Sequence, residues 1–128
     1  MRTRLAIVVC AILLAASGRA LAHHSFTAEF DADKPVKLTG TVTKVEWTNP
    51  HTWFFMDVKN ADGTVANWGF EMPGPAQLLR QGLTRNSMKI GDVLTVDARR
   101  ARDDSTNANA QTIVSASTGK QLFPGPSQ

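Results

Sequence analysis

Apolar and polar residues alternate with a period of two along most of the chain after residue 34, which is typical of β-strands that bury one face. The clearest example runs from residue 51 to residue 59, where Phe54 and Met56 fall on one face. Trp53 and Phe55 fall on the opposite face of the same segment. The pattern predicts five strands and a short sixth one, at residues 35–47, 51–59, 64–71, 93–101, 111–116 and 120–123.

The breaks between these segments predict how the strands are connected. Asp62 and Gly63 favour a tight hairpin turn between the second and third strands. A short helix is expected over residues 76–81, because it begins after a Pro-Gly-Pro stop and ends at Gly82. Gly40 interrupts the first strand, which indicates a bend or bulge there. Three strands, a helix and two further strands predict an all-β fold with one short helix: a small OB-like barrel of five or six strands.

The first 22 residues have the pattern of a cleavable export signal. Two arginines precede an apolar run of about a dozen residues, whereas about 20 are needed to span a bilayer. Ala20 and Ala22 are the small residues that a signal peptidase accepts. We therefore expect cleavage after Ala22, a periplasmic or secreted location and no stable membrane anchor. The expected organisation is a signal at 1–22, a lead-in at 23–34, an OB-like barrel at 35–123 and a flexible tail at 124–128.

Composition narrows the chemistry of the mature part. The only cysteine of the chain, Cys10, lies in the signal, which excludes a disulfide or a thiolate metal site from the mature fold. Three of the 14 Lys and Arg residues also lie in the signal, so the mature chain has 11 basic and 11 acidic residues and a balance of zero. A nucleic-acid binder usually has a clear basic excess, so nucleic acid is not expected as a partner. The basic cluster at 99–102 is interpreted as a solvated strand end, and residues 103–109 as a polar loop.

The three histidines are the candidate metal ligands. Cleavage after Ala22 would give His23 a free α-amine beside its imidazole, and this pair can chelate Cu(II). His51 would add a second imidazole to complete a histidine brace, or His24 would do so instead. Copper is therefore the candidate cofactor. The alternative is that His23 and His24 belong to a flexible lead-in and that His51 only holds a turn.

Three further residues are candidates for contact with a small ligand or a periplasmic partner protein. Trp53 and Phe55 lie on the face of their strand that the core does not need. Glu71 lies between two apolar residues at the end of the third strand, where it could line the mouth of the barrel. No catalytic residue is identified, because Ser25 beside His24 has no third group to orient the pair.

Several segments of the mature chain together have a specific pattern. They are His23-His24-Ser25-Phe26, Glu29-Phe30-Asp31, Lys34-Pro35-Val36, Gly40 to Thr43, Glu46-Trp47, Asn49 to Phe54, Trp68 to Glu71 and Gly91-Asp92. The chain resembles, through these segments, a family of small exported bacterial proteins catalogued only as a domain of unknown function. The resemblance implies export and a compact β domain, and it assigns no activity to any residue.

These observations favour an exported, non-enzymatic binding or accessory module. Its ligand would contact the aromatic face or the loop around His51. The competing hypothesis is a copper-dependent redox enzyme that uses the same histidines.

Overall fold

The computed structural model describes residues 26–125. They form six strands and a short helix between the third and fourth strands, preceded by a helical segment at residues 26–29. The elements are β1 (Phe30–Glu46), β2 (Thr52–Lys59), β3 (Val65–Met72), α2 (Pro75–Arg80), β4 (Val93–Ala101), β5 (Asn107–Ser115) and β6 (Gln121–Phe123). The predicted signal and its cleavage site lie outside the described residues.

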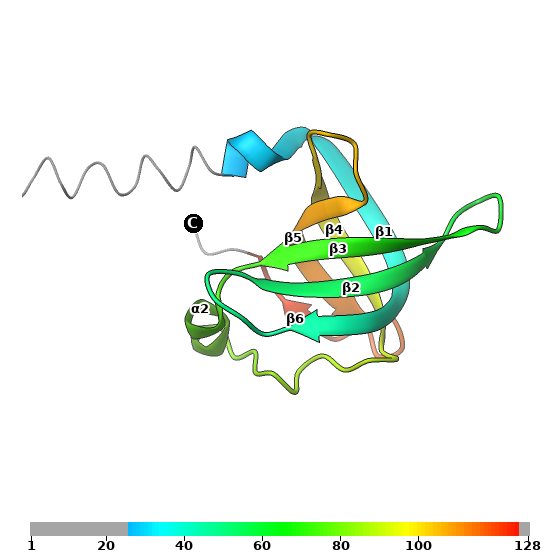
Figure 1. The fold of residues 1–128 in the computed structure, drawn as a ribbon. Coiled ribbons are helices and arrows are strands. Elements are labelled where there is room, and N and C mark those ends of the chain that lie inside the picture. The colour runs from blue at the N-terminus through cyan, green and yellow to red at the C-terminus, as the bar shows by residue number, and fades with distance from the viewer. Residues whose placement is uncertain (1–25, 126–128) are drawn as a thin grey trace, which may run out of the picture.

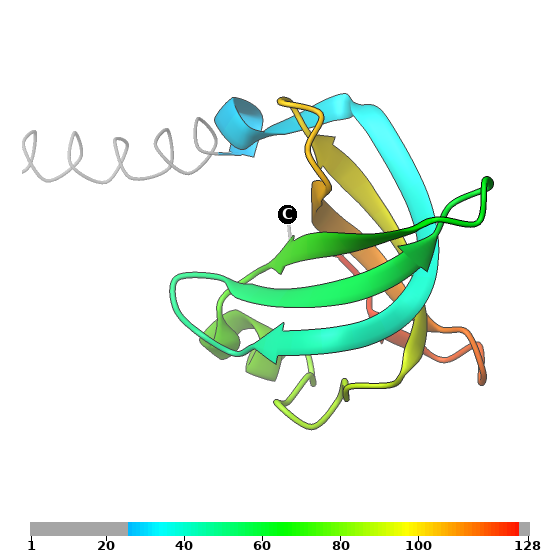
Figure 2. The same ribbon diagram turned by 45° about the vertical axis from the view of Figure 1, so that its right-hand side comes forward.

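The strands form one sheet that closes into a barrel (Figures 1 and 2). Their order is β3-β2-β1-β4-β5-β6, and a parallel pairing of β3 with β5 joins the two sides. β1 is long enough, at 17 residues, to pair with β4 along its first part and with β2 along its last part. The prediction of an all-β, OB-like barrel is confirmed, with six strands.

Gly40 lies close to the point where β1 passes from one partner strand to the other. A Cβ atom at this position would lie 2.5 Å from the carbonyl oxygen of Asp57 and 3.0 Å from a methyl group of Val58. The first distance is too short for a Cβ atom and the second is tight, so the approach of β1 to the backbone of β2 favours glycine here.

Two strands begin earlier than the alternation predicts. β1 begins at Phe30, which pairs with Ala101 and is buried, although the charged residues that follow it hide the strand pattern. β5 begins at Asn107, so part of the predicted polar loop is strand. Its inward positions are Ala108 and Ala110, whose small side chains give only a weak apolar signal. The β4–β5 loop is therefore shorter than expected and covers residues 102–106.

The core fills the inside of the barrel. Phe54 and Phe70 are fully buried, and their ring centroids lie 5.0 Å apart. Leu78 of α2 joins the same core with no exposed surface. In both views α2 lies on one side of the barrel, whereas the helical segment 26–29 and the β4–β5 loop lie on the other (Figures 1 and 2). No helix among residues 26–125 is long and apolar enough to cross a membrane.

Candidate functional site

A cavity of about 340 Å³ lies between the helical segment 26–29, β2 and the β4–β5 loop. Glu29 and Phe30 contribute one wall, and Trp53 contributes a second. Ser105 and Asn107 contribute a third from the β4–β5 loop and the start of β5. The hydroxyl oxygen of Ser105 is buried within this wall, whereas Asn107 is exposed.

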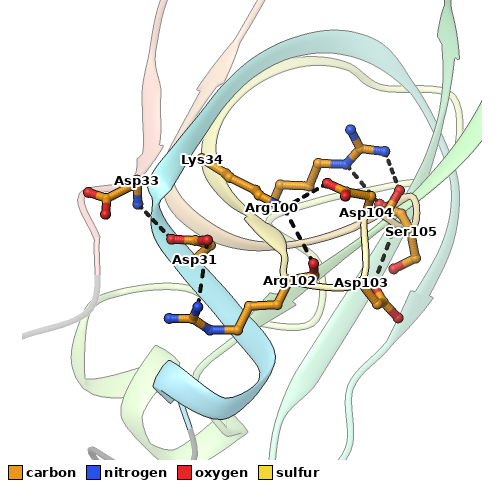
Figure 3. A network of polar contacts seen from close by, with 8 residues as sticks. All are labelled: Asp31, Asp33, Lys34, Arg100, Arg102, Asp103, Asp104 and Ser105. Carbon is orange, nitrogen blue, oxygen red and sulfur yellow. Dashed lines mark hydrogen bonds and ion pairs between the residues drawn. The ribbon is translucent and has the colours of Figure 1, made fainter.

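The N-terminal segment is fastened to the barrel by Arg102, at the first position of the β4–β5 loop (Figure 3). Its backbone N–H donates to the carbonyl oxygen of Glu29 at 2.9 Å, and its Nε donates to the carbonyl oxygen of Thr27. Its Nη1 lies 3.6 Å from a carboxylate oxygen of Asp31. One arginine thus holds three residues of the segment that precedes and begins β1.

A second ion pair fastens the same two segments. The Nζ of Lys34 lies 2.8 Å from Oδ1 of Asp104 and donates to the carbonyl oxygen of Arg102 at 3.3 Å (Figure 3). The hydrogen bond and the positive charge of Lys34 lower the pKa of Asp104 below its usual 3.8. We call Asp31, Lys34, Arg102 and Asp104 the N-terminal clamp.

The β4–β5 loop also has its own internal support. Arg100 donates to the carbonyl oxygens of Asp104 and Ser105, and its guanidinium group lies 5.3 Å from the centre of the Trp68 ring. The side chain of Asp103 accepts a hydrogen bond of 3.0 Å from the N–H of Ser105, which lowers the pKa of this carboxyl group. The loop is therefore held by its own hydrogen bonds beside the cavity that it lines.

The outer face of β2 carries the two predicted aromatic contacts. Trp53 and Phe55 are both half-buried, and their rings stack at 6.4 Å with an angle of 22°. Phe55 lies over Gly69 of β3, where a Cβ atom would come within 3.1 Å of its ring. Lys44 places its ammonium group 5.4 Å from the centre of the Phe55 ring. Trp53 therefore borders the cavity, whereas Phe55 already has an intramolecular cation.

Glu71 is the register partner of Trp53 and is only 8% exposed. Asn109 of β5 donates to its Oε1 at 3.3 Å, and Gln111 donates to Asn109 at 2.7 Å. The Nδ1 atom of His51 lies 3.4 Å from Oε2 of Glu71. The side chain of His51 is 45% exposed. Burial and the negative charge of Glu29 raise the pKa of Glu71, and the interactions with His51 and Asn109 oppose this increase.

The structure thus brings three of the predicted site residues together: His51, Trp53 and Glu71. Phe55 lies one position further along the same face. His23 and His24 lie outside the described residues, and within residues 26–125 no three His, Cys, Asp or Glu side chains are grouped as a metal site.

The sequence interpretation missed the N-terminal clamp. The basic cluster was expected to be solvated, but Arg100 and Arg102 hold the loop and the N-terminal segment. The charged residues Asp31, Asp33 and Lys34 interrupt the apolar alternation, so the sequence offered no regular signal for this clamp.

Comparison with known proteins identifies a family whose function is unknown. A family model described as a family of unknown function, DUF6152, matches residues 10–110. The chain belongs to the DUF6152 family. Comparison with curated proteins finds no match.

The DUF6152 chain is also similar to a solved structure, the mitochondrial single-stranded DNA binding protein Rim1 from S. cerevisiae. The two chains are 13% identical with a TM-score of 0.48, and the match covers 75% of this chain and 98% of that one. At this identity the likeness concerns the fold alone.

One prediction is corrected by this comparison. The zero charge balance was expected to exclude nucleic acid as a partner, and this exclusion is corrected: a similar solved structure is that of a single-stranded DNA binding protein, and a zero balance does not exclude this class of partner. The physical reason is that net charge is a sum over the whole domain and does not describe how the charges are distributed on one surface.

Proposed function

We propose that this DUF6152 chain is an exported, non-enzymatic binding module whose ligand occupies the cavity beside Trp53. The observation that carries the proposal is the position of Trp53. It lies half-buried on the outer face of β2 and forms one wall of a cavity of about 340 Å³. Small-ligand sites are concave, contain aromatic side chains and a few polar groups, and begin at about 300 Å³.

The polar groups around the cavity suit recognition rather than catalysis. Asn107 offers an exposed amide group on one wall, and Glu71 is held by Asn109 beside Trp53. Export is supported by the signal pattern in residues 1–22. The proposed location is the periplasm or the extracellular space, where the ligand would be a small molecule or a group on a partner protein.

The cavity can be tested with isopropanol as a general small-molecule probe. In ¹⁵N-labelled mature protein, isopropanol should shift the indole N–H signal of Trp53 and the amide of Asn107 in a saturable way. Ala28→Trp should abolish these shifts, because Ala28 lines the cavity and a large side chain there would fill it. Ala61→Trp in the β2–β3 turn is the matched control and should leave them unchanged. Saturable shifts that persist in Ala28→Trp would place the ligand elsewhere.

Binding of Cu(II) is the second candidate function, and the geometry of His51 favours it. Two ligand atoms on one ion at bonds of about 2.0–2.1 Å lie roughly 3 Å apart. The His51 Nδ1 and Glu71 Oε2 atoms are 3.4 Å apart, so both could bind the same ion after a small shift. The α-amine and imidazole of His23, or the ring of His24, would complete the site. With an open coordination position, the same ligands would support a copper-dependent redox enzyme.

The copper candidate can be tested by moving the free α-amine away from His23. Protein that begins at His23 should bind Cu(II) more tightly than protein with one extra N-terminal residue, because the extension keeps every histidine but removes the chelating amine. His51→Ala should change the copper EPR spectrum if His51 is a ligand. Equal, weak binding by the authentic and extended proteins would refute this candidate. Redox turnover would distinguish an enzyme from a binder.

A further inference from the structure

Two aromatic rings of this fold, Phe55 and Trp68, have a cationic side chain over them, whereas the ring of Trp53 borders the cavity. Lys44 lies over Phe55 at 5.4 Å, and Arg100 lies over Trp68 at 5.3 Å. Both distances fall within the range of about 6 Å over which an aromatic face attracts a positive charge. No cation of the described residues lies over Trp53, which borders the cavity instead. The cavity therefore offers an aromatic surface that a ligand's cation could use.

The charges at the cavity point to the same kind of ligand. Glu29 and Asp103 both line it, and Glu71 lies beside Trp53 on the neighbouring strand. Arg102 is the one basic residue among the cavity-lining residues that the structure describes. Its guanidinium group already contacts Asp31 and the carbonyl oxygen of Thr27. Arg100 interacts electrostatically with Asp103, whereas no ion pair of the described residues involves Glu29, so Glu29 gives the cavity a negative charge that is not balanced.

We propose that the cavity binds the ammonium group of a small organic cation, with Trp53 below the charge and Glu29 and Asp103 beside it. This inference rests on the proposed function and names the chemical class of the ligand. At about 340 Å³ the cavity is at the small end of ligand sites, so the bound group is compact, such as a primary amine or a trimethylammonium group.

The hydrogen bond from the N–H of Ser105 supports the electrostatic part of the inference. It lowers the pKa of Asp103, so this carboxylate keeps its charge to lower pH than an ordinary aspartate does. Glu29 is exposed at the rim, where its charge attracts a cation but is screened by salt. Binding is therefore expected to weaken as the salt concentration rises.

Choline and its neutral isostere 3,3-dimethylbutan-1-ol are the probes for the test. They have nearly the same shape, so only the charge distinguishes them. Choline should shift the indole signal of Trp53 in the mature protein and bind about ten times more tightly than the alcohol. Trp53→Leu should abolish choline binding, followed in this variant by the amide signal of Asn107 at the same cavity. Phe55→Leu is the matched control and should keep it, because the Phe55 ring already has Lys44 over it.

Glu29→Gln should weaken choline binding several-fold without weakening the alcohol, because it removes charge and keeps the shape of the side chain. Equal affinities for choline and the alcohol at the Trp53 signal would overturn the ammonium inference but leave the binding module intact. Loss of all shifts, with isopropanol as well, would overturn both.

The bound ammonium group can belong to a free molecule or to a lipid headgroup. A second experiment, with lipid vesicles, distinguishes these two sources. Mature protein should be sedimented with phosphatidylcholine vesicles in the presence and absence of free choline. Co-sedimentation that Trp53→Leu abolishes supports the inference with a lipid as the source. Choline binding without co-sedimentation supports it with a free molecule as the source. Co-sedimentation that Trp53→Leu leaves unchanged, without a choline shift, overturns it.

Discussion

The two sides of the barrel are closed by different kinds of interaction. On the α2 side, Leu78, Leu83 and Met88 are buried at 0%, 4% and 6% exposure and belong to the core. On the opposite side, the N-terminal segment is held by the clamp, in which the side chains of Lys34 and Arg102 are 36% and 48% exposed. One closure removes apolar surface from water, and the other pairs charges that remain partly in water.

This difference separates stability from function. Burying a large apolar side chain contributes about 1.5–3 kcal/mol, whereas an exposed ion pair contributes about 0–1 kcal/mol. The α2 side is therefore expected to carry much of the folding free energy. The ion pairs of the clamp side contribute little of it, and the cavity with Trp53 lies on that side. The comparison predicts that the two sides respond very differently to substitution.

The largest effect is expected from Leu78→Ala, which would break the apolar closure. Leu78 has no exposed surface, so the substitution should lower the free energy of unfolding by about 2–5 kcal/mol. Leu79→Ala is the matched control on the same helix, because Leu79 is 56% exposed, and it should change stability little. Urea denaturation measures both. Similar losses for the two variants would contradict the assignment of stability to the α2 side.

The next largest effect is expected at Gly40, where β1 passes from pairing with β4 to pairing with β2. Gly40→Val should lower the free energy of unfolding by about 1–3 kcal/mol, because its Cβ would lie 2.5 Å from a carbonyl oxygen of β2. Thr41→Val, on the next and exposed position of β1, is the control and should have little effect. Thermal unfolding followed by circular dichroism compares the two. An unchanged melting temperature for Gly40→Val would show that β1 and β2 can separate at no cost.

Much of the barrel could be predicted because its strands alternate strongly. Phe54, Met56 and Phe70 are fully buried, as their positions on the alternating faces predict. The starts of β1 and β5 could not be found in this way. Residues after Phe30 are charged because they serve the clamp, and the inward residues of β5 are alanines. Hydrophobic alternation fails where side chains are small or are used for ion pairs.

The candidate site was only partly predictable for a related reason. Trp53 and Glu71 could be selected by their own pattern, as an outward aromatic residue and an acid between apolar neighbours. Their meeting depends on the register of β2 with β3, which the sequence pattern alone does not specify. The role of Arg102 depends on a contact with Asp31, some 70 positions earlier, and no local pattern indicates such a contact.

A smaller effect is expected from Arg102→Met, which loosens the clamp side without removing the apolar stem of the side chain. The free energy of unfolding should fall by less than about 1 kcal/mol, because the lost ion pair is exposed. Hydrogen exchange of the Arg102 amide, which donates to Glu29, should nevertheless become faster. Arg99→Met, on the adjoining strand β4, is the control for the loss of one charge. Destabilisation as large as that of Leu78→Ala would show that the two sides do not differ.

The smallest effect is expected from Asp104→Asn, and its pH dependence identifies the cause. Lys34 lowers the pKa of Asp104 in the folded protein, so the ion pair stabilises the fold at pH values above the ordinary pKa of 3.8. This contribution is lost as the pH falls through the lowered pKa, because the carboxylate becomes protonated and no longer attracts Lys34. Wild type should therefore be slightly more stable than Asp104→Asn at pH 7, and the difference should disappear in strong acid. Lys34→Gln should reproduce the effect, and the double variant should add nothing further. Urea denaturation across this pH range measures the difference, and a gap that persists in acid would show that the clamp acts by packing rather than by charge.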